Sequence, residues 1–354
     1  MEPTVTICVP HHAGWQHLQT LLLSLHALAP DGPSYRTLIV DNASRDGSRE
    51  MLDEQFTEVD ILPLDANYGF AHALNLAVVH AQTEWIAFLN NDMRVHSRWL
   101  IEAMECAGRN NVDCVASRIL SWDGTRTQFA GGEINLLGKG FEWTDEDCDV
   151  EAERDLLFAC GGAMLIRRNL FVDAGGFDRE YELIYEDVDL GWRLNLYGYK
   201  VRYAPRSRVY HRQHASLAQV EYRRKAVYYE RNSLATMYKN LGAENWAVLM
   251  PALFRLAVHR TEALMQLPCD GYSHLCGVQA FFDHLTRWRE KRRVVQSRRR
   301  ISDEEIFARF FVSPMRLWGY TPKHTEVLRD SRYQRYREEI LSIADFGLKS
   351  GGQG

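Results

Sequence analysis

Short apolar runs recur along the first quarter of the chain. Each run is rich in β-branched and aromatic residues, a pattern that predicts β-strands. Because the runs are continuously apolar rather than alternating with polar residues, the strands they predict are buried on both faces. The runs are VTICVP from Val5, RTLIVD from Arg36, VDILPL from Val59 and WIAFLN from Trp85.

The segments after the first three runs carry helical periodicity. Leucines between residues 18 and 25 recur at spacings that place them on one face of a helix. Phe70, Leu74 and Ala77 share a face in the same way. This alternation of strands and helices predicts a parallel sheet covered on both faces. In such sheets the ligand site lies at the carboxyl ends of the strands, where the strand order reverses.

The middle of the chain predicts an irregular excursion followed by a return to the sheet. Residues 121–155 are rich in Gly, Asp, Glu and aromatic residues without a sustained period. FACGGAMLIRR predicts a strand entered through a tight turn at Gly161 and Gly162, EDVDLGWRLNLYG a helix, and KVRYAP a strand leading to His211. Beyond about Leu217 the patterns are helical. We expect an α/β domain over 1–215, a helical region over 216–300, and a helical tail over 301–354 with a disordered end.

Composition narrows the class of protein. The chain is 46% hydrophobic and 25% charged, as in ordinary globular proteins, and its net charge of -5 implies no general attraction to nucleic acid. The seven cysteines are scattered and form no C-x-x-C pair, which argues against a disulfide framework and a zinc site. The N-terminus does not resemble a secretory signal, and the apolar run from Ala247 is interrupted by Pro251 and Arg255. We therefore expect a cytoplasmic protein without a transmembrane segment.

Polar residues follow two of the predicted strands. Asp41 in VDNAS has two interpretations: a loop and helix cap, or a carboxylate that accepts hydrogen bonds from a nucleoside. Asp92 follows Asn90 and Asn91 in LNND, which is also good turn chemistry. If the stretch is instead a binding site, the side chains of Asn90, Asn91 and Asp92 suit a divalent cation that is already held by a diphosphate.

A second group of candidate residues lies further along the chain. Glu186, Asp187 and Asp189 fall in the first turn of a predicted helix, where the helix dipole alone favours acids. A carboxylate there is equally suited to act as a general base toward an alcohol. His211, at the end of a short strand, is either structural or a metal ligand that meets Asp92 around one ion.

Eight stretches in this order resemble the family 2 glycosyltransferases, particularly the rhamnosyltransferase-like branch that builds bacterial surface polysaccharides. They are VTICVP, VDNASRDGS, NYGFAHALN, FLNND, GGAMLIRR, GGFDREYELIYEDVDLGWRL, GYKV and VYH, running from Val5 to His211. The resemblance implies a GT-A type α/β fold: an open, mostly parallel twisted sheet with helices on both faces, plus a C-terminal helical extension. It also implies inverting transfer of a sugar from a nucleotide-diphosphate donor to a hydroxyl group.

The resemblance assigns roles to individual residues of this sequence. Asp187 would be the catalytic base, with Glu186 beside it. Asp92 and His211 would bind a divalent metal, Mn²⁺ or Mg²⁺. The substrate and nucleotide site would be formed by Pro10, His12, Asp41, Asn67, Gly69, Asn90, Asn91, Gly161 and Gly162. Two features depart from the family pattern: His12 stands where many relatives carry asparagine, and the acidic D-x-D element is reduced to N-N-D.

The expected partners are a nucleotide-sugar donor and a glycan or lipid-linked glycan acceptor. The branch favours dTDP-rhamnose as the donor, with UDP-hexoses next. Self-association into a homo-oligomer is left open. The alternative function is a non-catalytic sugar-nucleotide-binding or scaffold protein of a polysaccharide assembly complex, although a scaffold has no need of Asp187.

A basic block near the C-terminus suggests a membrane partner. Residues 287–300 contain a single acid, Glu290. With the apolar residues before it, this block suits an anionic membrane surface, where lipid-linked acceptors reside, and predicts peripheral association with the inner face of the cell membrane. A packed helix with a solvated basic end fits the pattern equally well. The apolar face consists of Phe281, Phe282, Leu285 and Trp288.

Overall fold

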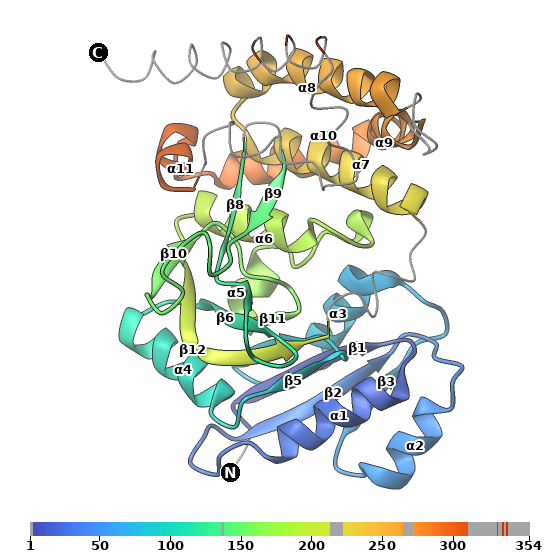
Figure 1. Cartoon of the computed structure of the whole chain (residues 1–354), viewed down its shortest axis with the longest axis vertical. Helices are drawn as coiled ribbons and strands as arrows, with labels where there is room; N and C mark the ends of the chain where they lie inside the picture. The colour runs from blue at the N-terminus through green and yellow to red at the C-terminus, as the bar shows by residue number, and fades with distance from the viewer. Residues whose placement is uncertain are drawn as a thin grey trace. The chain divides into compact units, whose positions relative to one another are not determined.

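The computed structural model describes residues 3–135, 138–212, 222–264 and 272–310, together with Ser331, Arg335 and Glu338. The chain divides into two compact units, and most of their elements are labelled in Figure 1. The predicted boundary near Ala215 and the predicted disordered end lie outside the described residues. The first unit comprises Met1–Gly132, Glu142–Leu194 and Tyr199–Gln219, and the second comprises Glu133–Phe141, Asn195–Gly198 and Val220–Gly354.

The first unit is built on a ten-stranded sheet. Its strands are β1 (Val5–His11), β2 (Tyr35–Asp41), β3 (Asp60–Pro63), β4 (Trp85–Leu89), β5 (Met93–Val95), β6 (Cys114–Ser121), β7 (Thr127–Phe129), β10 (Arg154–Leu156), β11 (Ala163–Arg167) and β12 (Val201–His211). They follow the order β10-β12-β6-β11-β4-β1-β2-β3, with β5 paired to β12 and β7 paired to β6. A separate pair is formed by β8 (Gly132–Ile134) and β9 (Gly140–Glu142).

The sheet is mixed, because β11 runs antiparallel to both of its neighbours. The predicted parallel arrangement holds for β1 with β2 and β4, for β2 with β3, and for β6 with β12. The residues of β11 are buried except at its last position, Arg167. A strand covered on both faces is apolar whichever way it runs, so the hydrophobic pattern alone did not reveal this direction.

Helices cover both faces of the sheet. The predicted leucine face, Leu18, Leu21, Leu22 and Leu25, is wholly buried. The chain moves from β1 outward to β2 and β3 and then returns to the other side of β1 at β4. Right-handed crossovers therefore place the first two helices on one face and the third on the other. The helices of this unit are α1 (Trp15–His26), α2 (Ser48–Gln55), α3 (Gly69–His80), α4 (Trp99–Asn110), α5 (Arg168–Asp173), the 3-10 turn η1 (Arg179–Tyr181) and α6 (Glu186–Leu196), whose last two residues belong to the second unit.

The reversal of strand order falls between β1 and β4, so the carboxyl ends of these two strands flank the crevice where such sheets bind ligands. Residues 10–12 and 90–92 lie at this crevice. The predicted excursion over residues 121–155 contains the short strands β7, β8 and β9 and the start of β10. Sequence periodicity did not predict these strands, because each is only three residues long.

From Tyr222 onward, the elements in the described part of the chain are helices, as predicted. Phe281 and Trp288 are 1% and 0% exposed, whereas Phe282 is 47% exposed. A break near His284 separates the two helices that carry these residues, so they do not form one continuous exposed apolar face. No helix in the described part of the chain is long and apolar enough to cross a membrane. The helices are α7 (Tyr222–Asn240), α8 (Ala243–Leu264), α9 (Tyr272–Asp283), α10 (Leu285–Arg298) and α11 (Asp303–Phe310).

Candidate active site

Asp187 lies in the first turn of α6 and is held by two backbone amides. The amide of Gly161 donates to Oδ2 at 2.9 Å, and the amide of Val188 donates to Oδ1 at 2.8 Å. A Cβ atom at position 161 would lie 3.4 Å from the Asp187 Cβ, so the glycine turn brings backbone close to the carboxylate. Burial raises the pKa of Asp187, and the two hydrogen bonds oppose that rise. The result is an oriented carboxylate of increased basicity.

Glu186 is buried beside Asp187. It is 6% exposed, and its Oε2 atom has no hydrogen-bond partner among the described residues. Burial, followed by the negative charge of Asp187, raises the pKa of Glu186 to about 8. Glu186 therefore carries a proton at neutral pH, which leaves Asp187 as the ionised member of the pair.

The loop before α6 has an unusual backbone. Glu182, Ile184 and Tyr185 have φ angles of 58°, 71° and 75°. For a β-branched residue such as Ile184 this region is a genuine outlier, and each such residue costs on the order of 1–3 kcal/mol. The Glu182 carbonyl accepts a hydrogen bond from Phe70, and a Cβ atom at Gly69 would lie 3.0 Å from the same oxygen. Gly69 thus lets the start of α3 approach the loop that leads to Glu186 and Asp187.

Asp92 and His211 meet, as predicted. The antiparallel pairing of β5 with β12 places His211 opposite Met93, and His211 Nε2 lies 3.6 Å from Asp92 Oδ1. Asp92 is 3% exposed. His211 Nδ1 is 3.0 Å from Oε1 of Gln128, a residue of β7 that the sequence analysis missed.

This pair fits a divalent metal. If His211 Nδ1 donates to Gln128, the Nε2 lone pair faces Asp92, the arrangement that metal-binding histidines adopt. Two ligands of one ion, each at about 2.0–2.2 Å, are separated by about 3.0–3.6 Å, which matches the observed spacing. In the described part of the chain no group of three or more His, Cys, Asp or Glu is placed to hold a metal. Any ion held here would therefore need ligands beyond these two side chains.

The ends of β1 and β2 carry the predicted nucleoside residues. Pro10 pairs with Val40 in the sheet, and Asp41 is 5% exposed. Asp41 Oδ1 accepts a hydrogen bond from the Ser44 amide at 2.8 Å, which is the loop role that the sequence left open; it does not cap α2, which begins at Ser48 after the N-cap residue Gly47. His12 is exposed, and its Nδ1 lies 2.8 Å from the Asn42 carbonyl oxygen.

Asn42 is a connecting residue that the sequence analysis did not select. Its Nδ2 donates to the Gly69 carbonyl at 3.1 Å, and its Oδ1 accepts from the Tyr68 amide at 2.8 Å. Asn67 Oδ1 accepts from the Gly69 amide at 2.9 Å. The predicted residues Asn67 and Gly69 are therefore tied to the end of β2 through Asn42. The signal available in the sequence was the position of Asn42 directly after Asp41.

The two asparagines before Asp92 join neighbouring strands. Asn91 Nδ2 donates to His11 Nδ1 at 2.9 Å and to the Ala13 carbonyl at 3.1 Å. Burial lowers the pKa of His11, which keeps the ring neutral and able to accept this bond. The Asn90 amide donates to the Gly162 carbonyl at 3.0 Å, and a Cβ atom at Gly162 would lie 2.6 Å from Asn90 Nδ2. Asn90 and Asn91 therefore link β4 to β11 and β1, and Gly162 is required for close packing.

Glu142, at the end of β9, is a further acid that the sequence did not indicate. Its side chain is exposed, yet desolvation by surrounding protein, and then the charge of Asp187, raises its pKa to about 7, while His211 acts in the opposite direction. These interactions place the Glu142 carboxyl group near both the candidate base and the candidate metal ligand. It lies in the predicted excursion, where no motif marks it.

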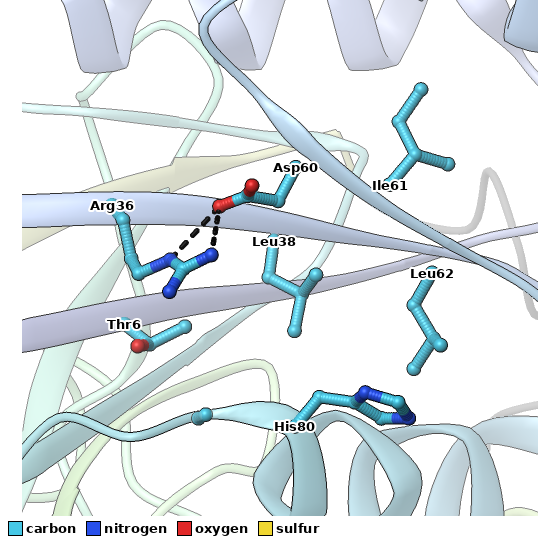
Figure 2. A pocket seen from close by; sticks show the side chains of 8 residues that line it. Thr6, Arg36, Leu38, Asp60, Ile61, Leu62 and His80 are labelled. Carbon is cyan, nitrogen blue, oxygen red and sulfur yellow. Dashed lines mark hydrogen bonds and ion pairs between the residues drawn. The ribbon is translucent and has the colours of Figure 1, made fainter.

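A pocket of about 210 Å³ lies away from these residues (Figure 2). It includes Thr6, Arg36 and Asp60, from the amino-terminal parts of β1, β2 and β3, whereas the candidate site lies at the carboxyl ends. Arg36 donates to Asp60 Oδ2 from Nη2 at 2.6 Å and from Nε at 2.8 Å. The cation on the pocket wall is thus already paired, and the pocket is separate from the candidate site.

Glu186→Gln is expected to stabilise the protein at high pH. The folded state holds the Glu186 proton up to a pKa of about 8, against 4.5 for an ordinary glutamate, so stability is lost as pH rises between these values. Glutamine removes this loss, which is on the order of a few kcal/mol. Thermal unfolding at pH 5 and pH 9 should show a gain in Tm only at the higher pH. Glu50→Gln, at an exposed position in α2, is the control. An equal shift at both pH values contradicts the burial argument.

Solved structures identify the class of fold. The crystal structure of GalNAc-T7 with UDP, GalNAc and Mn²⁺ aligns with a TM-score of 0.58 at 16% identity, covering 82% of this chain and 54% of that one. The crystal structure of S. aureus TarS aligns with a TM-score of 0.54 at 14% identity, covering 83% and 52%. At these identities the likeness is one of fold. It confirms the predicted glycosyltransferase fold of GT-A type, with its helical C-terminal region.

Family comparison is consistent with the fold. Residues 6–174 match the model of Glycosyl transferase family 2, the family that the sequence resembles. The O-antigen biosynthesis protein RfbC of Myxococcus xanthus is 31% identical over 234 residues, covering 60% of this chain and 18% of that protein. An N-acetylglucosaminyl-diphospho-decaprenol L-rhamnosyltransferase of Mycobacterium tuberculosis (strain ATCC 25618 / H37Rv) is 28% identical over 221 residues, covering 55% of this chain and 71% of that protein. These relatives support the rhamnosyltransferase-like branch.

Proposed function

We propose that this protein is an inverting, metal-dependent glycosyltransferase. It moves a sugar from a nucleotide-diphosphate donor to a hydroxyl of a glycan or lipid-linked glycan during surface polysaccharide synthesis. The observation that carries this proposal is the position of Asp187, oriented by the Gly161 and Val188 amides next to a protonated Glu186. A scaffold protein has no use for such a pair, which argues against the non-catalytic alternative.

Asp187 acts as the general base. The acceptor hydroxyl attacks the anomeric carbon while its proton passes to the Asp187 carboxylate. A new carbon–oxygen bond forms as the bond to the diphosphate oxygen breaks, so single displacement inverts the anomeric centre. A carboxylate is a weak base toward an alcohol, and positioning by the two amides contributes as much as basicity. The raised pKa of Asp187 makes its carboxylate a stronger base, which also favours proton transfer.

Asp92 and His211 are the residues that would hold the divalent ion, Mn²⁺ or Mg²⁺. When bound, such an ion supplies electrostatic neutralisation of the leaving diphosphate. Gln128 orients the His211 ring toward Asp92. At the other end of the crevice, Pro10 and Asp41 face the nucleoside in this proposal. His12, Asn67, Gly69, Asn90, Asn91, Gly161 and Gly162 complete the substrate site.

The relatives favour a rhamnose donor and a lipid-linked acceptor. The mycobacterial relative is named for L-rhamnosyl transfer to an N-acetylglucosaminyl-diphospho-decaprenol, and the relative from Myxococcus xanthus for O-antigen biosynthesis. We therefore place dTDP-rhamnose first and UDP-hexoses second. Contact with an anionic membrane surface would depend on the basic α10, because Phe281 and Trp288 are buried.

A panel of nucleotide sugars tests this function. Calorimetric binding of dTDP-rhamnose, UDP-galactose, UDP-glucose, UDP-N-acetylglucosamine and GDP-mannose would be measured with Mn²⁺ and with chelator. We expect one donor, dTDP-rhamnose, to bind in a metal-dependent manner. Binding of no donor under either condition would reject the proposal in favour of a scaffold role.

A further inference from the structure

Helix α6 packs directly on the backbone of the segment that joins β10 to β11. The contact is made by Gly191, which is buried one helical turn after Asp187. A Cβ atom at position 191 would lie 2.5 Å from the Leu157 carbonyl oxygen and 2.5 Å from the Phe158 Cα atom. Real Cβ atoms do not approach backbone atoms this closely, so only glycine lets α6 lie at this distance.

The same segment meets α6 again one turn earlier in the helix. The Gly161 amide donates to Asp187 Oδ2 at 2.9 Å. Residues four apart lie on one face of a helix, so Asp187 and Gly191 face the same stretch of chain. Phe158 and Gly161 are three residues apart along that stretch. Two contacts on successive turns of α6 therefore fix its distance from the segment, one at Gly191 and one at Asp187.

The segment opposite Gly191 is held in place from its other side. The Phe158 ring packs so closely on β8 that a Cβ atom at Gly132 would overlap it. It also contacts the Phe129 ring, and the two ring centres are 6.1 Å apart. Phe158 is 3% exposed, and Leu157 is fully buried. A side chain at position 191 would therefore displace α6 rather than the segment on which it packs.

A displacement of α6 would separate Asp187 from Gly161. The hydrogen bond from Val188 lies within the helix and moves with it, whereas the hydrogen bond from Gly161 crosses between the two elements. One methyl group at position 191 requires a shift of about 1 Å, because nonbonded carbon atoms ordinarily lie about 3.5 Å apart. A hydrogen bond of 2.9 Å is lost when its partners separate by that much.

We infer that Gly191 is a positioning residue, which keeps Asp187 within hydrogen-bonding reach of the Gly161 amide by letting α6 pack on bare backbone. It acts through Asp187 rather than on a substrate. Its effect on catalysis rests on the proposed function, in which Asp187 is the base. Its effect on the Asp187 carboxyl group is a property of the packing and can be measured without sugar transfer.

Direct titration of Asp187 tests the packing. Burial raises the pKa of Asp187 and the hydrogen bond from Gly161 opposes that rise, so loss of this bond should raise the pKa further. Carbon-13 NMR of the aspartate-labelled full chain would measure it, and Asp187→Asn would identify the signal. We expect the rise in Gly191→Ala. Both this variant and its control retain the titratable groups whose charges interact with Asp187, which are Glu186, Glu142 and Cys160.

Gly108→Ala is the matched control, and the Asp187 signal should titrate normally in it. Gly108 also lies in a helix, α4, but among the described residues nothing beyond that helix's own backbone lies within 4 Å of a Cβ atom built there. The control therefore adds the same methyl group to a helix without displacing it.

Hydrolysis of dTDP-rhamnose tests the catalytic consequence. We expect Gly191→Ala to lower kcat about 100-fold, the loss that a misplacement of about 1 Å can cause. Affinity for dTDP, measured by calorimetry, should stay near its normal value, because Pro10 and Asp41 lie on β1 and β2 rather than on α6. Gly108→Ala should match the unmodified protein in both measurements.

An unchanged Asp187 titration in Gly191→Ala, or an equal rise in Gly108→Ala, overturns the inference. Gly161→Ala is a second variant in case Gly191→Ala does not fold. Its Cβ atom would lie 3.4 Å from that of Asp187 and 3.3 Å from a ring atom of Phe70, a tight contact that side chains can relieve. It should also raise the pKa of Asp187, and an unchanged titration there overturns the inference too. If the unmodified chain hydrolyses no dTDP-rhamnose, the failure lies with the proposed function, and the titration still decides the role of Gly191.

Discussion

Asp187→Asn is expected to abolish sugar transfer, lowering kcat by about 10²- to 10⁴-fold, the usual contribution of a general base. Asparagine has nearly the same shape, and its single Oδ1 atom can still accept one of the two backbone hydrogen bonds, from Gly161 or from Val188. The variant loses the other hydrogen bond and the ability to take the acceptor proton. Nucleotide binding should therefore stay near its normal value, which calorimetry with the cognate nucleoside diphosphate would measure.

Glu186→Gln is the matched control for this result. Because burial and the charge of Asp187 raise the pKa of Glu186 to about 8, the residue is protonated at neutral pH, and an amide resembles that form. Its kcat should remain within about tenfold of normal, a loss smaller than a missing base produces. Near-normal turnover in Asp187→Asn, or an equal collapse in Glu186→Gln, would rule out Asp187 as the base.

The pH dependence of transfer follows from the same pair. Asp187 must be ionised to accept a proton, and burial raises its pKa above the ordinary value of 3.8. Activity should therefore fall as pH decreases through that raised pKa, on the acid side of the profile. Glu186→Gln removes the neighbouring titration, so the acid limb of its kcat/KM profile should report Asp187 alone.

The sequence predicted those parts of the site that lie at the ends of buried strands. Asp41 and Asp92 follow continuously apolar runs, and a strand end is one of the few places where such a run can give way to a functional carboxylate. Asp187 was identifiable because it begins a helix of clear periodicity. In each case the local pattern and the residue proposed for function coincide in one short stretch.

Other parts of the candidate site and of the fold depend on packing between distant segments, which no local sequence pattern encodes. Gln128 and Glu142 lie in short strands within the excursion, and their positions near His211 follow from pairing between distant segments. The apolar face around Phe281 was predicted as one helix, whereas the structure breaks it near His284 and buries Trp288. Periodicity continues across such a break, because residues on two successive helices can keep the same spacing in the sequence.

Replacing either member of the metal pair is expected to remove the metal dependence of donor binding. Asp92→Ala deletes the carboxylate, and His211→Ala deletes the imidazole whose Nε2 lies 3.6 Å from it. Because Asp92 and His211 are the two protein ligands proposed among the described residues, loss of one leaves a single described side chain to hold the ion. Donor affinity in Mn²⁺ should then fall to the level seen with chelator, which titration calorimetry in both conditions would show.

Gln128→Ala is expected to weaken metal binding without abolishing it. Without the Gln128 oxygen at 3.0 Å from His211 Nδ1, the ring loses the partner that fixes its tautomer and orientation. Metal affinity should fall by about 10- to 100-fold, the usual cost of losing such an outer partner, while chelator-treated protein binds donor as before. His26→Ala, at an exposed histidine paired with Glu58 at the end of α1, is the control. If His211→Ala retains full metal-dependent binding, His211 is structural, and the carboxylate of Asp92 must then act with ligands from the substrate alone.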